Sequence, residues 1–285
     1  MRIHPIETGN FKLDGGAMFG VVPKKIWSRY HEADNENLIG LTMRCLLIED
    51  GERRILIDTG IGKKQNEHFF SHYKLFGNHS LQGSLANLGY GLDDITDVFL
   101  SHLHFDHCGG AVVRDQKNDL KPAFKNAKYW TNKKHWKWAM SPNPRESASF
   151  LKENLQPLMD SGQLNFIETN EQNWLDESHL GFGILFVDGH TEKQMIPHIR
   201  YQDKTLVFAA DLIPTATHIK LPYIMSYDVR PLTSMKEREK FLEKAESENY
   251  YIFLEHDLEH ELCTVEKNSK GIILKNKLKF DEVFK

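Results

Sequence analysis

The residues best suited to chemistry crowd into SHLHFDHCGG, at residues 101–110. His102, His104, Asp106 and His107 fall within six consecutive positions of this stretch. Histidine is neither a strong helix former nor a strong strand former, so local structure does not explain the crowding. Imidazole and carboxylate groups bind zinc, iron and similar metals. The spacing therefore predicts a metal site.

The same stretch predicts how its side chains converge. Alternate side chains of an extended segment point the same way, so His102, His104 and Asp106 can face a common ion. A turn at Phe105 and Asp106 would bring His107 inward as well. The two glycines that close the stretch permit tight packing behind that turn.

Further candidate ligands end other apolar runs of the chain. His190 follows ILFVDG, Asp211 follows LVFAA and His256 follows YIFLE, much as His102 follows DVFL. Sites in α/β proteins lie at the carboxyl ends of strands, so we expect these residues to share one cleft. Asp58 ends the run RILI, and we expect it to hydrogen-bond a ligand or its loop rather than to bind metal.

Seven candidates exceed the four positions of one tetrahedral ion, so we expect two neighbouring ions that share a carboxylate. The proposed ligands of the first ion are His102, His104 and His190. Those of the second ion are Asp106, His107 and His256, with Asp211 bridging the pair. We expect ordinary surface or core positions for most other histidines, such as His31, His68, His79, His135 and His179.

Strands and helices alternate along the chain, which is typical of the α/β class. Apolar runs predict strands at residues 46–48, 55–57, 95–104, 127–132, 183–190, 204–212 and 250–257. Leucines on one face predict a short helix over residues 80–89, ended by Gly89. A second, amphipathic helix is predicted over residues 233–249, with Thr233 as its N-cap.

Composition narrows the class of protein. The 285 residues suffice for one large α/β domain or two modest ones, and no linker-like run marks a boundary. The net charge of −4 gives no basic excess for nucleic acid. The chain begins without an apolar signal-like region and has no run of about 20 apolar residues. We therefore expect a cytoplasmic protein with neither nucleic-acid nor membrane partners.

The cysteines argue against a disulfide framework. Cys45, Cys108 and Cys263 are an odd and sparse set. Cys108 follows His107 directly and is an alternative ligand, but we favour a small buried side chain beside the site. The oligomeric state is open, and a homodimer is favoured only because such dimers are the commonest soluble oligomers.

With these residues in place, the chain resembles the metallo-β-lactamase superfamily. HLHFDH at residues 102–107 is similar to the hallmark motif of that family, and His190, Asp211 and His256 follow in the family's order. IDTG at residues 57–60 is similar to its early aspartate loop. The resemblance implies one hydrolase domain over residues 1–285, an αββα sandwich of two mixed β-sheets flanked by helices.

Two further segments resemble the branch that contains quorum-quenching N-acyl homoserine lactonases. These segments are DGGAMFGVVPKKIWSRY at residues 14–30 and ADLIPTATHIKLPYIMSYD at residues 210–228. The chain departs from that branch after His190, where TEKQM replaces a Pro-Gly-His run. It also has Pro214 where a tyrosine is common, and Tyr223 or Tyr227 is the alternative source of a phenol.

The resemblance implies a metal-dependent hydrolase. Two divalent ions, zinc first and manganese or iron as alternatives, would lower the pKa of a shared water from 15.7 to about 7. The hydroxide would open a lactone or cleave an ester, with an N-acyl homoserine lactone as one candidate substrate. Asp106 would bind metal and pass a proton to the leaving oxygen. The alternatives are a phosphotriesterase-like hydrolase and a mononuclear iron sulfur oxygenase of the same fold.

Substrate selection would come from outside the metal motif. An apolar stretch after Gly16 can line a pocket for an acyl chain or an aromatic group, and ordinary core packing or a dimer contact is the alternative. The candidate pocket residues are Met18, Phe19, Trp27, Tyr223 and Tyr227. The aromatic segment at residues 68–79 is either a lid or a packed helix.

Overall fold

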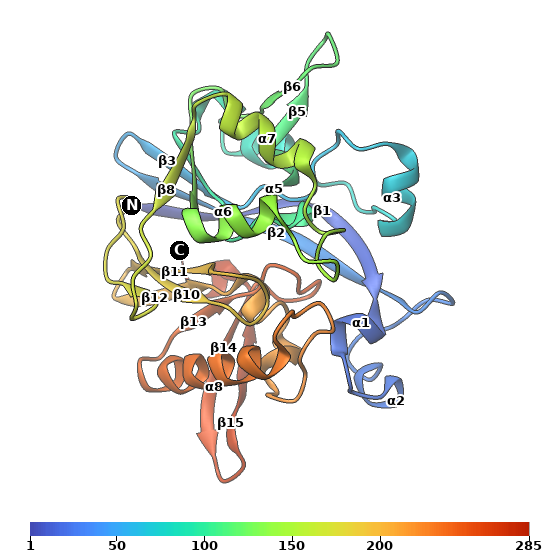
Figure 1. Ribbon diagram of the computed structural model, residues 1–285. Helices are drawn as coiled ribbons and strands as arrows, with labels where there is room; N and C mark the ends of the chain where they lie inside the picture. Colours follow the sequence, from blue (N-terminus) through green and yellow to red (C-terminus); the bar gives the residue numbers. More distant parts are fainter. Residues whose placement is uncertain (285) are drawn as a thin grey trace. The chain divides into compact units, whose positions relative to one another are not determined.

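A computed structural model describes residues 1–284, which form two compact units (Figure 1). Unit 1 comprises residues 1–10 and 43–170, and unit 2 comprises residues 11–42 and 171–284. Strands β1 (Arg2–Asp14) and β2 (Leu38–Asp50) each run from one unit into the other. The single hydrolase domain stays a prediction.

The sheet of unit 1 has the strand order β1-β2-β3-β4-β7-β8. Its further strands are β3 (Arg53–Ile57), β4 (Asp97–Phe99), β7 (Lys128–Asn132) and β8 (Leu164–Ile167). The strands predicted at residues 46–48 and 55–57 are confirmed, and β2 and β3 pair antiparallel as a hairpin. Strands β3, β4, β7 and β8 pair in parallel, with Ile57 opposite Phe99. Parallel pairing brings the carboxyl ends of β3 and β4 to one edge, where Asp58 and the histidine stretch begin.

Short helices and a small hairpin complete unit 1. They are α3 (Glu67–Tyr73), α4 (Leu81–Asn87), η1 (Leu92–Asp94), α5 (Phe105–Cys108), η2 (Gly109–Ala111), β5 (Val112–Arg114), β6 (Leu120–Pro122), α6 (Lys133–Met140) and α7 (Lys152–Asp160). The predicted helix at residues 80–89 is confirmed as α4. Ser80 caps it by accepting from the Gly83 N–H, and its buried Leu81 and Leu85 join the core around β3 and β4.

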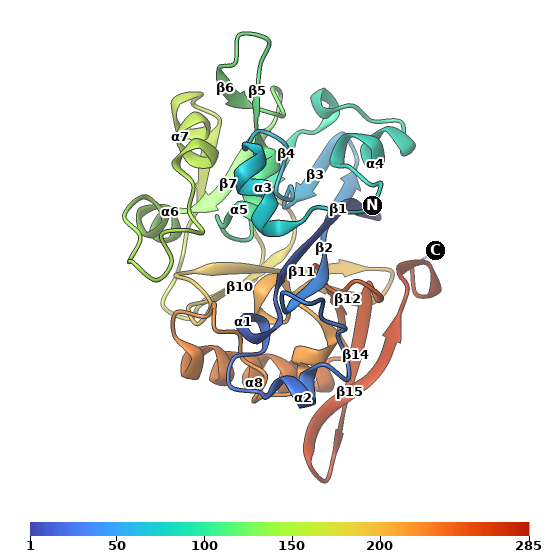
Figure 2. The same cartoon turned by 90° about the vertical axis from the view of Figure 1, so that its right-hand side faces the viewer.

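The sheet of unit 2 has the strand order β15-β14-β13-β12-β11-β10-β9. Its strands are β9 (Trp174–Leu175), β10 (Gly183–Val187), β11 (Gln194–Tyr201), β12 (Lys204–Phe208), β13 (Tyr251–Phe253), β14 (Leu262–Asn268) and β15 (Gly271–Leu278). Strands β12 and β13 pair in parallel, with Phe208 opposite Phe253. Their carboxyl ends therefore lie together, and Asp211 and His256 follow them. The hairpin β14–β15 projects past α8 (Figure 2).

The helices of unit 2 are α1 (Gly15–Phe19), α2 (Lys24–Trp27), η3 (Ala210–Leu212), η4 (Ala216–Ile219), α8 (Pro231–Ser247) and η5 (Phe280–Glu282). Helix α8 packs along β14, as Figure 1 shows. The predicted N-cap of this helix, Thr233, is wrong, because α8 begins at Pro231 after Arg230. Proline suits the first helical position, since its missing N–H has no partner there anyway. Within residues 1–284, none of the helices combines the length and the apolar composition needed to cross a bilayer.

Candidate metal centre

The histidine stretch of unit 1 is less extended than its spacing predicts. Strand β4 ends at Phe99, and α5 begins at Phe105. The N–H groups of His107 and Cys108 donate to the His104 carbonyl, so Asp106 and His107 lie on a short helix. The expected alternation therefore holds no further than His104. A helical turn closes here because the His104 carbonyl has two N–H donors within four residues.

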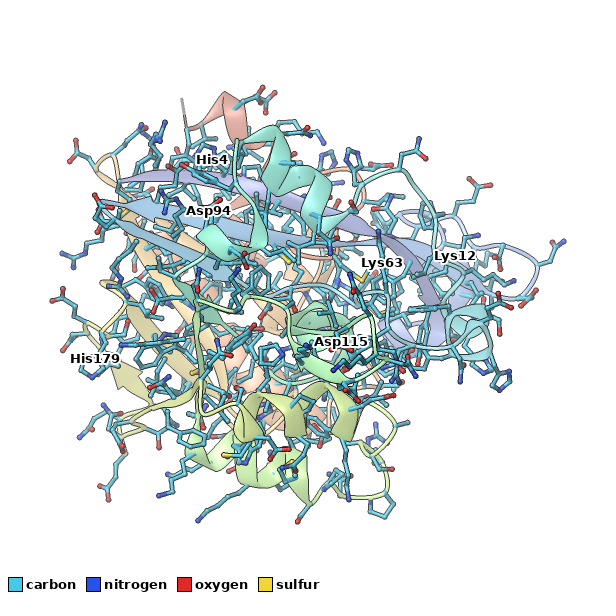
Figure 3. All side chains as sticks on the ribbon, turned by 90° about the horizontal axis from the view of Figure 1, so that it is seen from above. His4, Lys12, Lys63, Asp94, Asp115 and His179 are labelled. Carbon is cyan, nitrogen blue, oxygen red and sulfur yellow. The ribbon has the colours of Figure 1, made fainter. Side chains whose placement is uncertain are left out.

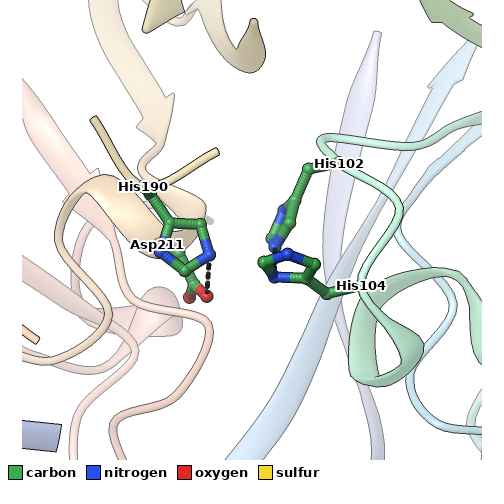
Figure 4. Close-up of side chains that lie close together, drawn as sticks. All are labelled: His102, His104, His190 and Asp211. Atoms are coloured by element: carbon green, nitrogen blue, oxygen red, sulfur yellow. Dashed lines mark hydrogen bonds and ion pairs between the residues drawn. The ribbon is translucent and has the colours of Figure 1, made fainter. Parts of the chain in front are cut away.

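The candidate ligands of unit 1 lie close together in pairs. His102 Nε2 is 3.1 Å from His104 Nδ1 (Figure 4), and His107 Nε2 is 3.6 Å from the Asp106 carboxylate. Ligands of a tetrahedral zinc ion lie about 3.3 Å apart when each bond is about 2.0–2.1 Å long. All four side chains are buried. These separations fit donor atoms that could share a cation, and the assignment of ligands to ions stays a prediction.

Asp58 hydrogen-bonds to Ser101 and His107 and so fixes part of this arrangement. It is fully buried in a left-handed conformation, with φ 59°. Its carboxylate accepts from the Ser101 N–H at 2.7 Å and from the Ser101 hydroxyl at 2.5 Å. The His107 Nδ1 lies 3.1 Å from the same carboxylate, and the Ser101 hydroxyl lies 3.1 Å from His102 Nδ1. Asp58 thus orients His107, a candidate ligand, and its role as an outer partner of a metal ligand stays a prediction.

Two further residues of unit 1 support the stretch, and sequence reasoning missed both. The Glu146 carboxylate lies 3.2 Å from His104 Nε2, and the Trp138 indole donates to it at 2.7 Å. His135, which we expected at an ordinary surface or core position, is buried and accepts from the Leu103 N–H at 2.9 Å. Neither residue ends an apolar strand, so nothing in the local pattern marks them.

Unit 2 contains a carboxylate between two imidazoles. Asp211 lies on η3, directly after β12. One of its oxygens is 3.1 Å from His190 Nε2 (Figure 4), and the other is 3.0 Å from His256 Nε2. All three side chains are buried. A carboxylate that presents each oxygen to a different histidine has the geometry of a bridging ligand.

The outer nitrogens of these two histidines are also held. His190 Nδ1 lies 2.8 Å from the Asp228 carboxylate, and His256 Nδ1 lies 2.7 Å from the Thr42 carbonyl. Burial disfavours the charged ring, but the Asp211 and Asp228 carboxylates outweigh it and raise the pKa of His190 to about 10. Sequence reasoning missed Asp228, although the segment that resembles the lactonase branch ends on it.

One pattern therefore recurs at all five candidate histidines. One ring nitrogen faces a neighbouring candidate ligand, and an oxygen of Asp58, Ser101, Glu146, Asp228 or Thr42 holds the other. Metal-binding histidines in proteins are oriented in this way, with the outer partner fixing which nitrogen carries the proton. Buried carboxylates are also costly unless a cation or donor compensates them. The donor set fits divalent cations of the zinc type.

The predicted pocket residues all belong to unit 2. Met18, Phe19 and Trp27 are at most 1% exposed, and Phe19 stacks on Trp27 with ring centroids 5.5 Å apart. Tyr223 is 8% exposed and Tyr227 is 36% exposed. The packing of Met18, Phe19, Trp27 and Tyr223 agrees with the alternative of core residues, whereas Tyr227 is exposed. The role of all five in substrate binding stays a prediction.

The aromatic segment at residues 68–79 contains a packed helix, α3. Phe69 and Tyr73 contact Phe105, with ring centroids 5.4 and 4.6 Å apart. Burial and the nearby Asp106 charge raise the pKa of Tyr73 to about 12, so this phenol stays protonated at neutral pH. The rings of Phe69 and Tyr73 thus pack on Phe105, the first residue of α5.

Gly110 lets the loop after β3 approach the loop after α5. A Cβ at this position would lie 2.2 Å from the Thr59 carbonyl oxygen. We expect Gly110→Ala to lower the free energy of unfolding by roughly 1–3 kcal/mol, because the two loops must separate. Chemical denaturation measures this loss. In Gly91→Ala, the control, the new methyl group would meet Asp94 at 3.6 Å. Equal stability of the two variants would contradict the account.

Arg238 on α8 holds the segment that follows Asp211. Its fully buried guanidinium donates to the carbonyls of Leu212, His218 and Tyr223 at 2.9, 3.0 and 2.6 Å. Burial lowers its pKa to about 10, so it remains charged at neutral pH.

Replacing Arg238 with methionine is expected to cost roughly 3 kcal/mol or more of unfolding free energy, because buried carbonyls lose their donor. Urea denaturation tests this expectation. Lys240→Met, at an exposed position of the same helix, is the matched control. A loss no larger than that of the control would show that Arg238 is dispensable.

The fold and donor set define a metallohydrolase-like protein, and comparison with known families agrees. The model of the metallo-beta-lactamase superfamily matches residues 44–256, and the chain belongs to this superfamily. A probable metal-dependent hydrolase from Staphylococcus aureus has a similar structure, with a TM-score of 0.84 and 28% identity over 97% of each chain. The predicted α/β class and metallo-β-lactamase fold are thereby confirmed.

Relatives that match only part of the chain include N-acyl homoserine lactonases, the branch that the sequence resembles. The chain is 34% identical to an N-acyl homoserine lactonase of Bacillus cereus over 84 residues, which are 26% of this chain and 34% of that protein. The chain thus spans about a third of the length of this relative. A dizinc quorum-quenching lactonase in complex with a homoserine product has a TM-score of 0.75 and 21% identity over 96% of this chain and 94% of its own. That likeness concerns the fold.

Proposed function

We propose that this protein is a metal-dependent hydrolase that opens lactones, N-acyl homoserine lactones among them, with two divalent ions. The observation that carries the proposal is the orientation of the histidines: each presents one nitrogen to a neighbouring candidate ligand while an oxygen holds the other. Such paired orientation suits metal binding, because the outer partner leaves the other ring nitrogen facing the neighbouring candidate ligand.

The proposed ligands come from both units. His102, His104 and His190 would hold one ion, and Asp106, His107 and His256 the other, with Asp211 shared. The two oxygens of Asp211, each facing a different histidine, support the bridging role. Family membership supports the convergence of the two sets, since the match extends from residue 44 to residue 256. Zinc is the proposed metal, because the set is rich in imidazole.

When bound, two such ions would supply a hydroxide at neutral pH and polarise the substrate carbonyl. The chain's own residues would fix the geometry. Asp58 and Asp228 would keep His107 and His190 in the tautomer with a free Nε2. Asp106 lies on α5 beside His107, and its carboxylate would carry a proton to the leaving oxygen. The Tyr73 phenol near Asp106 would stay neutral and so would not add a second negative charge beside that carboxylate.

A substrate panel tests the proposal. The zinc-loaded protein is offered N-hexanoyl homoserine lactone, a simple aryl ester and an aryl phosphotriester, and acid release is followed in a pH-stat. We expect the lactone to have the highest kcat/KM and chelation to abolish turnover. Preference for the phosphotriester would favour the phosphotriesterase alternative. One iron per chain in the protein as purified, with no hydrolysis, would favour the oxygenase. Either result would contradict the proposal.

A further inference from the structure

A basic pocket of unit 1 lies apart from the candidate ligands. Its volume is about 270 Å³. The residues that line it are Thr8, Thr59, Gly62, Lys63, Lys64, Leu81, Gln82, Gly110, Val113 and Arg114. This lining includes three cationic side chains and no carboxylate. A concave surface of this charge attracts an anion.

Lys64 is the unusual member of the lining, because it is a buried ammonium. It is 8% exposed, and its Nζ donates to the Gly109 carbonyl. Burial lowers its pKa to about 8. A buried ammonium held mainly by a carbonyl is costly unless an anion joins it.

Arg114 is positioned at the rim of the pocket. Its guanidinium donates to the carbonyls of Lys64 and Asn118 at 3.3 and 3.2 Å. It also lies 3.3 Å from the Glu153 carboxylate, whose side chain is 35% exposed. A single half-exposed carboxylate therefore faces this cluster of cations, and the positive charge is only partly balanced.

The remaining groups suit a small ligand with one charged end. Within residues 1–284, the side chains of Lys63 (Figure 3) and Gln82 make no hydrogen bond or ion pair, so both can turn to a ligand. Leu81 and Val113 give the pocket an apolar wall. Guanidinium and ammonium groups together favour phosphate oxygens, which accept several charge-assisted hydrogen bonds.

We propose that this pocket binds a phosphate group, carried by a small phosphate monoester or present as inorganic phosphate. Lys64 and Arg114 would hold the oxygens, and Lys63 would supply a flexible third cation. Part of the lining comes from the loops that follow Asp58 and His107, but the proposed binding does not depend on the hydrolase function. The alternative is that Lys64 has only a structural role, in which its ammonium donates to the Gly109 carbonyl.

Isothermal titration of the intact protein with inorganic phosphate and with phenyl phosphate tests the proposal, with chloride at matched ionic strength as the blank. We expect saturable binding to the unaltered protein. In Lys64→Met and Arg114→Gln, Kd is expected to rise at least about tenfold, because each loses a charge-assisted contact. Tighter binding of phenyl phosphate would indicate a monoester as the ligand, and equal binding would indicate phosphate itself.

Two controls separate this site from the metal centre. Lys134→Gln removes an exposed lysine of the same unit and should bind phosphate unchanged. Asp211→Ala, which alters the candidate metal centre, should also keep phosphate binding. Loss of binding in Asp211→Ala with retention in Lys64→Met and Arg114→Gln would overturn the proposal, as would the absence of saturable binding. If Lys64→Met does not fold, the exposed Lys63→Gln replaces it, with a smaller expected loss.

Discussion

Replacing Asp211 with alanine is expected to abolish hydrolysis and to remove metal from the protein. This carboxylate lies 3.1 Å from His190 Nε2 and 3.0 Å from His256 Nε2, so its loss leaves both imidazoles without their common neighbour. The rate should fall at least about a hundredfold, because the nucleophile depends on cations that lower the pKa of water. Elemental analysis and lactone turnover measure the two effects.

The matched control is Asp203→Asn, on the exposed turn between β11 and β12 of the same unit. Asparagine tolerates the left-handed conformation of this position, φ 60°, so the variant should fold and bind metal normally. Full metal content in Asp211→Ala would remove Asp211 from the ligand set. Normal turnover at reduced metal content would instead contradict the role of two ions.

The second large effect is expected for Asp58→Asn, which changes no proposed ligand. The new amide must place its NH₂ either against the Ser101 N–H or against both His107 Nδ1 and the Ser101 hydroxyl, because these last two share one carboxylate oxygen. When the NH₂ faces His107, the ring moves its proton to Nε2, the nitrogen that would bind metal. We expect metal affinity to fall about 10–100-fold, as for other outer partners of ligands.

Competition with a chelator of known affinity measures this change, and turnover at saturating metal measures what remains. Asp119→Asn, an exposed position in the same unit, is the control and should match the unaltered protein. An affinity within twofold of the control would mean that Asp58 serves only the loop. Recovery of most activity at high metal would separate weak binding from damaged chemistry.

The sequence was most informative about candidate metal ligands, because few residue types can bind a metal. Metal binding demands imidazole and carboxylate side chains, so residue type alone marks the stretch at residues 102–107 and the strand ends at His190, Asp211 and His256 as candidate ligands. Outer partners follow no such rule, because any oxygen suffices. Glu146 lies in a loop, and the partner of His256 is the Thr42 backbone carbonyl, which no residue pattern can mark.

Local conformation was harder to predict than chemistry. The spacing of His102, His104 and Asp106 suits an extended segment, but a helical turn at α5 closes with two N–H donors on one carbonyl. At α8, Thr233 is a good cap by type, while Pro231 begins the helix earlier. In both places several conformations suit the same residues, and the surrounding hydrogen bonds decide.

Anomalous diffraction from crystals of the zinc-loaded protein, recorded on both sides of the zinc edge, tests the central claim most directly. We predict two zinc ions, each bound by histidines of both units at about 2.0–2.1 Å, with Asp211 between them. The claim would be contradicted by ions held within one unit only, or by crystals without ordered zinc near His102, His190 and His256.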